Sequence, residues 1–223
     1  MIKLIDVEKD YEIGEDTAKV LKKINLTIKD GEFASIVGPS GCGKSTMMHI
    51  LGLLDKPTSG KVLLDDKDVS KLGDDSLSEF RNRYVGFIFQ QFNLINKLSV
   101  IENVVLPALY SKSKIDFDPY QRAEELLQRF GIIERRDYRP NKISGGQQQR
   151  VAIARALIMK PKLILADEPT GNLDSKSGAE ILKLLEKLNK DLKVTILIVT
   201  HDKEIAAEAR RQIKMKDGEI IDS

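Results

Sequence analysis

The sequence predicts an α/β fold built on a mainly parallel β-sheet. Short apolar runs rich in β-branched residues alternate with longer stretches of helical periodicity, as in strands joined by helices. Polar residues stand directly after four of the apolar runs, and the carboxyl ends of parallel strands form the edge at which such sheets bind ligands. A glycine-rich pattern typical of phosphate binding follows one of these runs. These observations predict a sheet whose carboxyl edge holds a phosphate-bearing ligand.

Composition limits the class of protein to which the chain can belong. Its 223 residues suggest one domain, and a net charge of +2 gives no electrostatic argument for a nucleic acid partner. The one cysteine, Cys42, excludes an internal disulfide and is natural in a reducing compartment. Residues 1–10 are too charged for a signal peptide, and no apolar run approaches the ~18 residues of a membrane span. We therefore expect a soluble chain that acts at a membrane only through a partner.

The order of the expected elements divides the chain. Residues 1–30 alternate apolar and polar side chains around a turn at Gly14, which predicts antiparallel strands that Lys61–Asp65 then joins. We predict one domain over residues 1–223, in which 1–90 and 161–223 form the core with this antiparallel β subdomain and 91–160 form a helical subdomain. The other predicted elements are strands at Val85–Phe89, Leu163–Ala166 and Val194–Val199, helices at Ala123–Phe130 and Gln147–Met159, and a hairpin over Ile213–Ile221.

The phosphate-binding pattern is Gly38–Ser45, which fits G-x-x-x-x-G-K-[ST]. An apolar run, Phe33–Val37, precedes it as a predicted buried strand, and a predicted helix begins after it. Glycines let the backbone close around an anion, so that successive N–H groups and the helix N-terminus point at phosphates. Lys44 would add positive charge, and the Ser45 hydroxyl would ligate Mg²⁺. The predicted phosphate contacts are Gly38, Pro39, Ser40, Gly41, Cys42, Gly43, Lys44, Ser45 and Thr46.

A second chemical pattern ends the predicted strand at residues 163–166. Four apolar residues lead into Asp167, as in proteins where an acid holds Mg²⁺ beside a phosphate-binding loop, here through the water shell of the ion. Glu168 follows at once, and a carboxylate beside the metal can orient or deprotonate a water for in-line attack on the terminal phosphate. Read alone, this acidic pair is also compatible with an ordinary solvated turn, and the presence of Gly38–Ser45 argues against that alternative.

A third pattern, Ser144–Gln147, lies in the helical region. Ser144 suits the N-cap of a helix, and Gly145 and Gly146 would let a ligand approach the helix N-terminus closely. The stretch is therefore a second candidate anion-binding device. Taken alone, it is as compatible with a capped structural helix that begins with two glycines.

The order and approximate spacing of these patterns resemble the nucleotide-binding domain of ABC transporters. The resemblance implies a P-loop NTPase core, an N-terminal antiparallel β subdomain, and a helical subdomain that carries Ser144–Gln147 as its signature motif. Ile143 departs from the leucine that is commoner before this motif, but both residues are apolar. The similarity extends from Tyr11 to the C-terminal hairpin and rests on Gly38–Ser45, Gln90, Ser144–Gln147, Asp167–Glu168, Asn172–Asp174 and His201.

The resemblance also implies roles for single residues. Tyr11 would stack on the adenine ring, Gln90 would sense Mg²⁺ and couple to membrane subunits, and His201 would contact the γ-phosphate. Asp174 would lie in a loop that crosses a dimer interface, while Ser144–Gln147 would cap the ATP bound by the other subunit. His49 is interpreted as a helix residue without a role. The implied catalytic residues are thus Glu168, His201 and Gln90, the metal contacts are Ser45, Gln90 and Asp167, and the contacts from the second subunit are Ser144, Gly145, Gly146, Gln147 and Asp174.

A member of this class would bind and hydrolyse ATP with Mg²⁺ in a head-to-tail homodimer that sandwiches two ATP molecules. Loss of γ-phosphate contacts on hydrolysis would open the dimer and drive separately encoded integral membrane permease subunits. The chain would be cytoplasmic and peripheral on the inner face of the cell membrane. Phe89–Leu94 and Ala166–Asp174 resemble the branch that serves lipoprotein release and macrolide export, whose relatives include peptide-antibiotic resistance systems. The cargo would be chosen by the membrane subunit.

Other proteins with a phosphate-binding loop fit less well. Guanine recognition by Asn-Lys-x-Asp fails at the last position of both Asn141–Ser144 and Asn189–Leu192, and a small-molecule kinase has no reason to carry the signature motif. DNA-repair ABC proteins insert long coiled coils before the signature, and translation-type ABC proteins carry two cassettes, whereas this chain has neither. The remaining alternative is a non-transport ATP-dependent clamp or regulatory scaffold on a membrane partner, against which the presence of Glu168 and His201 argues.

Overall fold

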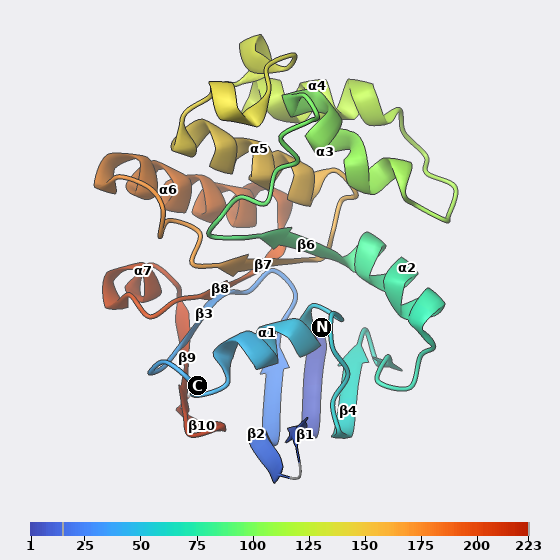
Figure 1. The fold of residues 1–223 in the computed structure, drawn as a ribbon, viewed down its shortest axis with the longest axis vertical. Helices are drawn as coiled ribbons and strands as arrows, with labels where there is room; N and C mark the ends of the chain where they lie inside the picture. The colour runs from blue at the N-terminus through green and yellow to red at the C-terminus, as the bar shows by residue number, and fades with distance from the viewer. Residues whose placement is uncertain (15, 223) are drawn as a thin grey trace.

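The computed structural model describes residues 1–14 and 16–222, which form two β-sheets with helices packed around them (Figure 1). The larger sheet has the strand order β10-β9-β3-β8-β7-β6, and the smaller has the order β2-β1-β4-β5. The strands are β1 (Ile2–Ile13), β2 (Asp16–Ile28), β3 (Phe33–Val37), β4 (Ser59–Leu64), β5 (Lys67–Asp68), β6 (Val85–Ile88), β7 (Leu163–Asp167), β8 (Thr195–Val199), β9 (Arg211–Lys216) and β10 (Glu219–Asp222). The helices are α1 (Lys44–Leu51), α2 (Asp74–Tyr84), α3 (Val100–Leu109), α4 (Pro119–Arg129), α5 (Gly145–Leu157), α6 (Ser175–Leu192) and α7 (Lys203–Ala207), with short 3₁₀ turns at Ile133–Arg135 and Pro140–Lys142.

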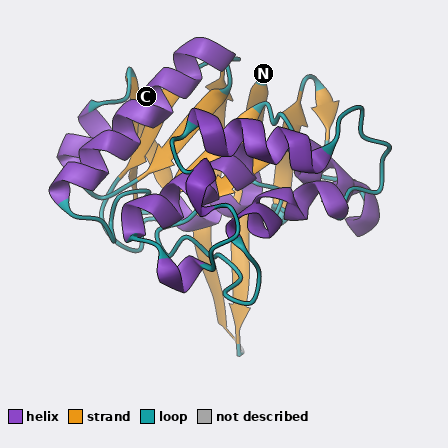
Figure 2. Ribbon diagram, turned by 90° about the horizontal axis from the view of Figure 1, so that it is seen from above, coloured by secondary structure: helices purple, strands orange, loops and turns teal. Residues whose placement is uncertain are grey.

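The larger sheet is mainly parallel, as predicted. Strands β6, β7, β8, β3 and β9 pair in parallel, and β10 returns antiparallel along β9 as the second half of a hairpin. Strands β3, β7 and β8 are buried over nearly their whole length because both faces of the sheet are covered, which explains their continuous apolar sequences (Figures 1 and 2). The predicted helix–strand alternation and the C-terminal hairpin are confirmed.

The two faces of this sheet belong to two separate clusters of buried side chains. In β8, Ile196 and Ile198 pack into a cluster with helices α3 to α6, whereas Leu197 and Val199 pack with α1 and the smaller sheet. This is the period of two expected of a strand whose successive side chains point to opposite faces. The parallel sheet therefore lies between the helical region above it and the antiparallel sheet below it in Figure 1.

The smaller sheet is antiparallel, as residues 1–30 predict. Strand β1 pairs with β2 on one side and with β4 on the other, so the strand predicted at Lys61–Asp65 does join this sheet, although it begins earlier, at Ser59. Leu21 and Ile24 are both buried despite an interval of three residues, because the pairing register of β1 and β2 shifts between them. The irregularity keeps the apolar face of the sheet toward the core.

Helix α5 begins at the predicted N-cap. The Ser144 hydroxyl accepts from the backbone N–H of Gln147, and the Gln147 side chain accepts from the backbone N–H of Ser144, which completes a capping box. The helix therefore begins at Gly145, two residues before the predicted start, and it ends at Leu157. Its first turn carries the signature motif, and its apolar face is buried against α3, α4 and β6.

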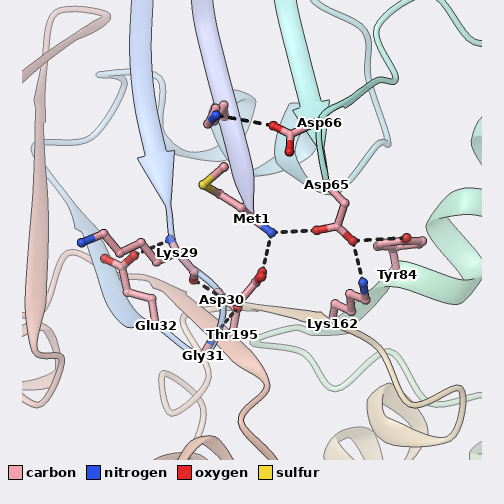
Figure 3. A network of polar contacts seen from close by, with 11 residues as sticks. Met1, Lys29, Asp30, Gly31, Glu32, Asp65, Asp66, Tyr84, Lys162 and Thr195 are labelled. Carbon is pink, nitrogen blue, oxygen red and sulfur yellow. Dashed lines mark hydrogen bonds and ion pairs between the residues drawn. The ribbon is translucent and has the colours of Figure 1, made fainter.

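Figure 3 shows a polar network where the two sheets and α2 meet. The Asp65 carboxylate accepts from the Met1 amine at 2.7 Å, from the Lys162 ammonium at 2.5 Å and from the Tyr84 hydroxyl at 3.4 Å. The Met1 amine also contacts Asp30. Lys162 and the Met1 amine together hold the pKa of the Asp65 carboxyl at about 2, well below its usual range. The network connects the end of β4 to the starts of β1 and β7.

None of the helices in the described residues is long and apolar enough to cross a membrane.

Candidate active site

The predicted site residues meet at the carboxyl edge of the larger sheet. The loop at 38–43 follows β3, Gln90 follows β6, Asp167 ends β7, and His201 follows β8. A pocket of about 520 Å³ opens at this edge. Its lining consists of Ser40, Gly41, Gly43, Lys44, Ser45, Thr46, Gln90, Asp167, Glu168 and His201, together with Val20 and Val199. The convergence predicted from strand ends is therefore present in the fold.

The loop between β3 and α1 has the shape of an anion cradle. Gly41 and Gly43 have φ values of 79° and 100°, which residues with a Cβ rarely adopt. The Lys44 ammonium donates to the carbonyls of Gly38 and Pro39, each at 2.8 Å, so the loop backbone encircles the charged group. Because α1 begins at Lys44, the N–H groups of its first turn point toward the helix N-terminus and favour an anion there.

Three members of the predicted loop do not line the pocket. Gly38 and Pro39 lie at the base of the loop, where a Cβ on Gly38 would come within 2.2 Å of the Met215 carbonyl oxygen. The side chain of Cys42 is buried, at 3 % exposed, so it can offer a nucleotide its backbone but not its thiol.

Glu168 is held in one orientation by groups at the end of β8. Its carboxylate accepts from the Thr200 hydroxyl and from the backbone N–H of His201, both at 2.8 Å. The His201 imidazole Nδ1 lies 2.5 Å from the same oxygen as that N–H. Glu168 itself has a left-handed backbone with φ of 42°, an uncommon conformation for a residue with a Cβ, and its side chain is only 16 % exposed. The carboxylate is fixed, partly desolvated and turned into the pocket.

Asp167 lies beside Glu168 in a different electrostatic setting. Burial raises the pKa of the Asp167 carboxyl, and the neighbouring Glu168 charge raises it further, whereas His49 and Lys44 act to lower it. A partly buried acid next to a second acid favours a nearby cation. His49 therefore contributes to the electrostatics of the Asp167 carboxyl. No sequence pattern indicates this contribution, because His49 lies one turn beyond Ser45 on α1 and resembles any other helix residue.

Gln90 is connected to the segment that follows Glu168. Its backbone carbonyl accepts from the Asn172 amide at 3.0 Å, and its side-chain Nε2 lies 3.4 Å from Asn172 Oδ1. The backbone of Gly171 passes so close that a Cβ there would meet Gln90 Nε2 at 2.7 Å. The segments that follow β6 and β7, which carry Gln90 and Glu168, are therefore joined by direct contacts.

The remaining predicted residues do not line the pocket, although Tyr11 interacts through its hydroxyl with Thr46, which does. Ser144–Gln147 and Asp174 cap the N-termini of α5 and α6 and do not line it. Tyr11, on β1, donates its hydroxyl to Asp55 at 2.8 Å, and the Lys9 ammonium lies 4.8 Å from its ring centroid. One chain alone thus assembles the phosphate loop and the acidic pair, but not the signature motif.

The family profile described as "ABC transporter" matches residues 21–171. The chain belongs to the ABC transporter family. It is an ATP-binding domain with the ATPase function of that family, as the resemblance predicted.

Relatives of this ABC domain include proteins of two lengths. It is 51 % identical to the uncharacterized ABC transporter ATP-binding protein MJ0796 of Methanocaldococcus jannaschii, over 99 % of this chain and 95 % of that protein. It is 52 % identical to the macrolide export ATP-binding/permease protein MacB of Chlorobaculum tepidum, over 100 % of this chain but 34 % of that protein. The chain therefore spans about a third of the MacB relative and nearly all of MJ0796. The predicted similarity to the macrolide-export branch is confirmed.

Solved structures of MJ0796 share the fold of this ABC domain. A dimeric post-hydrolysis state described as bound to ADP and Pi has a TM-score of 0.88 at 49 % identity, covering 99 % of this chain and 97 % of that chain. A second structure, described as a dimeric bacterial ABC transporter cassette, has the same TM-score at 50 % identity. The predicted α/β P-loop NTPase fold is confirmed by these neighbours.

Two residues of the ABC domain contact the site although the sequence analysis gave them no role in it. Thr200 positions Glu168 through its hydroxyl, and Asn172 binds Gln90. Asn172 belongs to the Asn172–Asp174 stretch on which the resemblance rests, and Thr200 directly precedes His201 at a strand end, so the available signals were the motif and the strand end. Which of them would turn toward Glu168 or Gln90 depends on the loop conformations, which the sequence pattern does not specify.

Proposed function

We propose that this ABC domain hydrolyses Mg²⁺-ATP in a head-to-tail homodimer and drives conformational change in separate membrane subunits. The supporting observation is the position of Ser144–Gln147. This stretch forms a partly exposed, capped helix N-terminus suited to an anion, yet it does not line the pocket of its own chain. A second copy related by two-fold symmetry would bring its signature motif over the nucleotide and complete the site. The MJ0796 structures are described as dimeric, which supports the same arrangement.

Each pocket residue has a defined task in this proposal. The loop N–H groups and Lys44 bind the phosphates, and Tyr11 stacks on the adenine ring. Glu168 orients a water and takes its proton as the water attacks the γ-phosphorus, while the bond to the β–γ bridging oxygen breaks to leave ADP and phosphate. Thr200 and His201 hold the Glu168 carboxylate in its orientation toward the pocket. His201 also contacts the γ-phosphate, and Asp174 contributes to the dimer interface.

The donor set at the pocket fits Mg²⁺. The Ser45 hydroxyl is exposed, and the carboxylate of Asp167 and the amide of Gln90 line the same pocket. Mg²⁺ prefers oxygen ligands and keeps several waters, so one carboxylate with substrate phosphates is a usual site. The raised pKa of Asp167 marks a carboxylate that a cation would stabilise. When bound, the ion would neutralise charge that develops on the phosphates.

A groove beside β6 suits a membrane partner. It has a volume of about 420 Å³, and its lining includes Leu54, Phe87, Phe89 and the exposed Tyr110 together with charged side chains. Phe89 is adjacent to Gln90, so the strand end that lines the nucleotide pocket also lines this groove. We infer that a cytoplasmic segment of a permease docks here and responds to the γ-phosphate through Gln90. The chain would then lie on the inner face of the membrane.

The branch of relatives suggests the type of transporter. MacB of Chlorobaculum tepidum is described as a macrolide export ATP-binding/permease protein, in which this domain corresponds to about a third of the length. We propose that this chain serves a transporter of the same type, which covers lipoprotein release and macrolide or peptide-antibiotic export. The permease would choose the cargo. A non-hydrolysing clamp is not favoured, because the MJ0796 neighbour is described as a post-hydrolysis state with ADP and Pi.

The substitution Ser144→Arg tests the role of the signature motif across the dimer. Arginine would remove the N-cap oxygen and place a bulky cation at the start of α5, outside the pocket of its own chain. We expect ATP binding to the monomer to stay within about twofold of wild type, whereas dimerisation and turnover are abolished. Fluorescent-nucleotide titration and phosphate release measure the two quantities. Unchanged turnover would show that the signature motif does not act on the nucleotide of the partner.

A further inference from the structure

A turn directly after Gln90 has an unusual backbone. Phe92 and Asn93 are consecutive non-glycine residues in the left-handed region, with φ values of 58° and 50°. A residue with a Cβ enters this region rarely, and asparagine does so more readily than phenylalanine. The turn is closed by short backbone bonds, from Phe92 N–H to the Phe89 carbonyl at 3.1 Å and from Asn93 N–H to the Gln91 carbonyl at 2.6 Å. Something outside the turn must hold it in this conformation.

Arg155, in the last turns of α5, provides that restraint. Its guanidinium donates to the Phe92 carbonyl at 2.8 Å and to the Asn93 carbonyl at 2.5 Å. Burial lowers the pKa of the guanidinium, and within residues 1–14 and 16–222 Arg155 forms no ion pair. Its charge is therefore compensated mainly by these two carbonyls, and charge-assisted hydrogen bonds of this kind are stronger than neutral ones.

The same turn also reaches the opposite end of α5. A Cβ built on Gly145 would lie 3.6 Å from Cζ of Phe92, so the phenylalanine ring packs beside the signature motif. Gly145 and Arg155 are ten residues apart, or about 15 Å along the helix axis, and the Arg155 side chain leans back toward the helix N-terminus. Phe92–Asn93 is thus attached to α5 at two points.

We propose that Arg155 is a positioning residue for ATP hydrolysis, which keeps the Phe92–Asn93 turn left-handed and so makes the loop of Gln90 move together with the signature helix. Displacement of α5 by nucleotide at its N-terminus is then passed to Gln90 through the guanidinium. From the other side, Asn172 fixes Gln90 to the segment after Glu168. The proposal rests on the proposed function for its effect on turnover, but the restraint itself is a property of the isolated chain.

Arg155→Ala and Arg155→Lys test the restraint without any catalysis. Hydrogen–deuterium exchange of the peptide spanning residues 89–95 reports the amides of Phe92 and Asn93. We expect at least a fivefold faster exchange in both variants, because lysine keeps the charge but cannot bond two carbonyls with one planar fork. Arg122→Ala is the matched control, since Arg122 also donates to two carbonyls near the end of α5, those of Leu157 and Ile158, but does not touch the turn. Unchanged exchange in the Arg155 variants would overturn the proposal.

Turnover then shows whether the restraint matters for hydrolysis. We expect both Arg155 variants to lower kcat about tenfold with KM within about twofold of wild type, and Arg122→Ala to leave kcat within about twofold. Asn93→Gly added to Arg155→Ala should restore at least a third of the lost kcat, because glycine takes the left-handed conformation without a restraint.

The absence of rescue would overturn the positioning role, as would an unchanged kcat. If the wild-type chain hydrolysed no ATP, the proposed function would fail, whereas the exchange measurement would still decide whether Arg155 restrains the turn.

Discussion

Glu168 shows how a single backbone conformation prepares a side chain for chemistry. Its left-handed φ turns the residue away from the line of β7, so that its carboxylate meets the end of the neighbouring strand β8. Such conformations cost about 1–3 kcal/mol each, and Glu168 is retained in it by the hydrogen bonds from Thr200 and His201. The carboxylate is therefore positioned before any nucleotide binds.

His201→Ala removes the imidazole but keeps the backbone N–H that also binds Glu168. We expect kcat to fall about 10-fold, which corresponds to ~1.4 kcal/mol of lost transition-state stabilisation, because both the contact with the carboxylate and the contact with phosphate disappear. KM should stay within about twofold of wild type. Steady-state phosphate release measures both constants. A kcat equal to that of wild type would show that the imidazole takes no part in hydrolysis.

The sequence predicts which residues meet in the fold where each stands next to a strand end or in a local motif. Asp167, Glu168, Gln90 and His201 follow from strand ends and Lys44 from the phosphate-binding pattern, and all of them line one pocket. The inward turn of Thr200 and the influence of His49 on Asp167 were not predicted, because each depends on a side-chain direction that a one-dimensional pattern does not carry.

Among the elements, helix α5 connects two parts of the molecule that bear on the site. Its N-terminus presents the signature motif, and its C-terminal turns hold the loop that follows Gln90. The predicted Ser144 cap was correct because a capping box is a local pattern of four residues. The bond between Arg155 and the turn at residues 92–93 joins positions about 60 residues apart, and no local periodicity encodes such a contact.

Asp65 links elements in a way that makes stability depend on pH. Its pKa of about 2 in the folded chain is below the ordinary value of 3.8, so the carboxylate stabilises the fold fully above about pH 5 and loses this contribution as pH falls from about 4 to 2. We expect Asp65→Asn to lower the free energy of unfolding by about 1 kcal/mol at pH 7, as for a partly exposed ion-pair network. The difference should shrink steadily below about pH 4 and be small at pH 2.

Urea unfolding of wild type and Asp65→Asn at pH 7, 4 and 2 measures this difference. Asp66→Asn is a suitable control, because Asp66 forms one long and exposed ion pair, at 3.5 Å to Lys3. A difference between wild type and Asp65→Asn that stayed constant from pH 7 to pH 2 would contradict a titrating network at this position.

For the whole molecule, the central observation is that the predicted site residues fall into two separate groups. The phosphate loop and the acidic pair line one pocket, whereas the signature motif lies elsewhere on the same chain. The sequence predicts both groups, because each is a local motif, and the resemblance implies that the signature motif acts on the other subunit. The fold shows that the two groups do not meet within one chain. The division of the chain into a core and a helical region over residues 91–160 remains a prediction. A head-to-tail dimer would place each signature motif over the pocket of its partner.

The solution mass of Glu168→Gln with and without ATP tests this account most directly. Glutamine keeps the shape of the side chain and removes the proposed base, so bound ATP should persist. We predict a mass near 25.0 kDa without nucleotide and about twice that value with Mg²⁺-ATP. A mass near 25.0 kDa under both conditions, in a sample shown to bind ATP, would contradict the proposal that ATP holds two copies together.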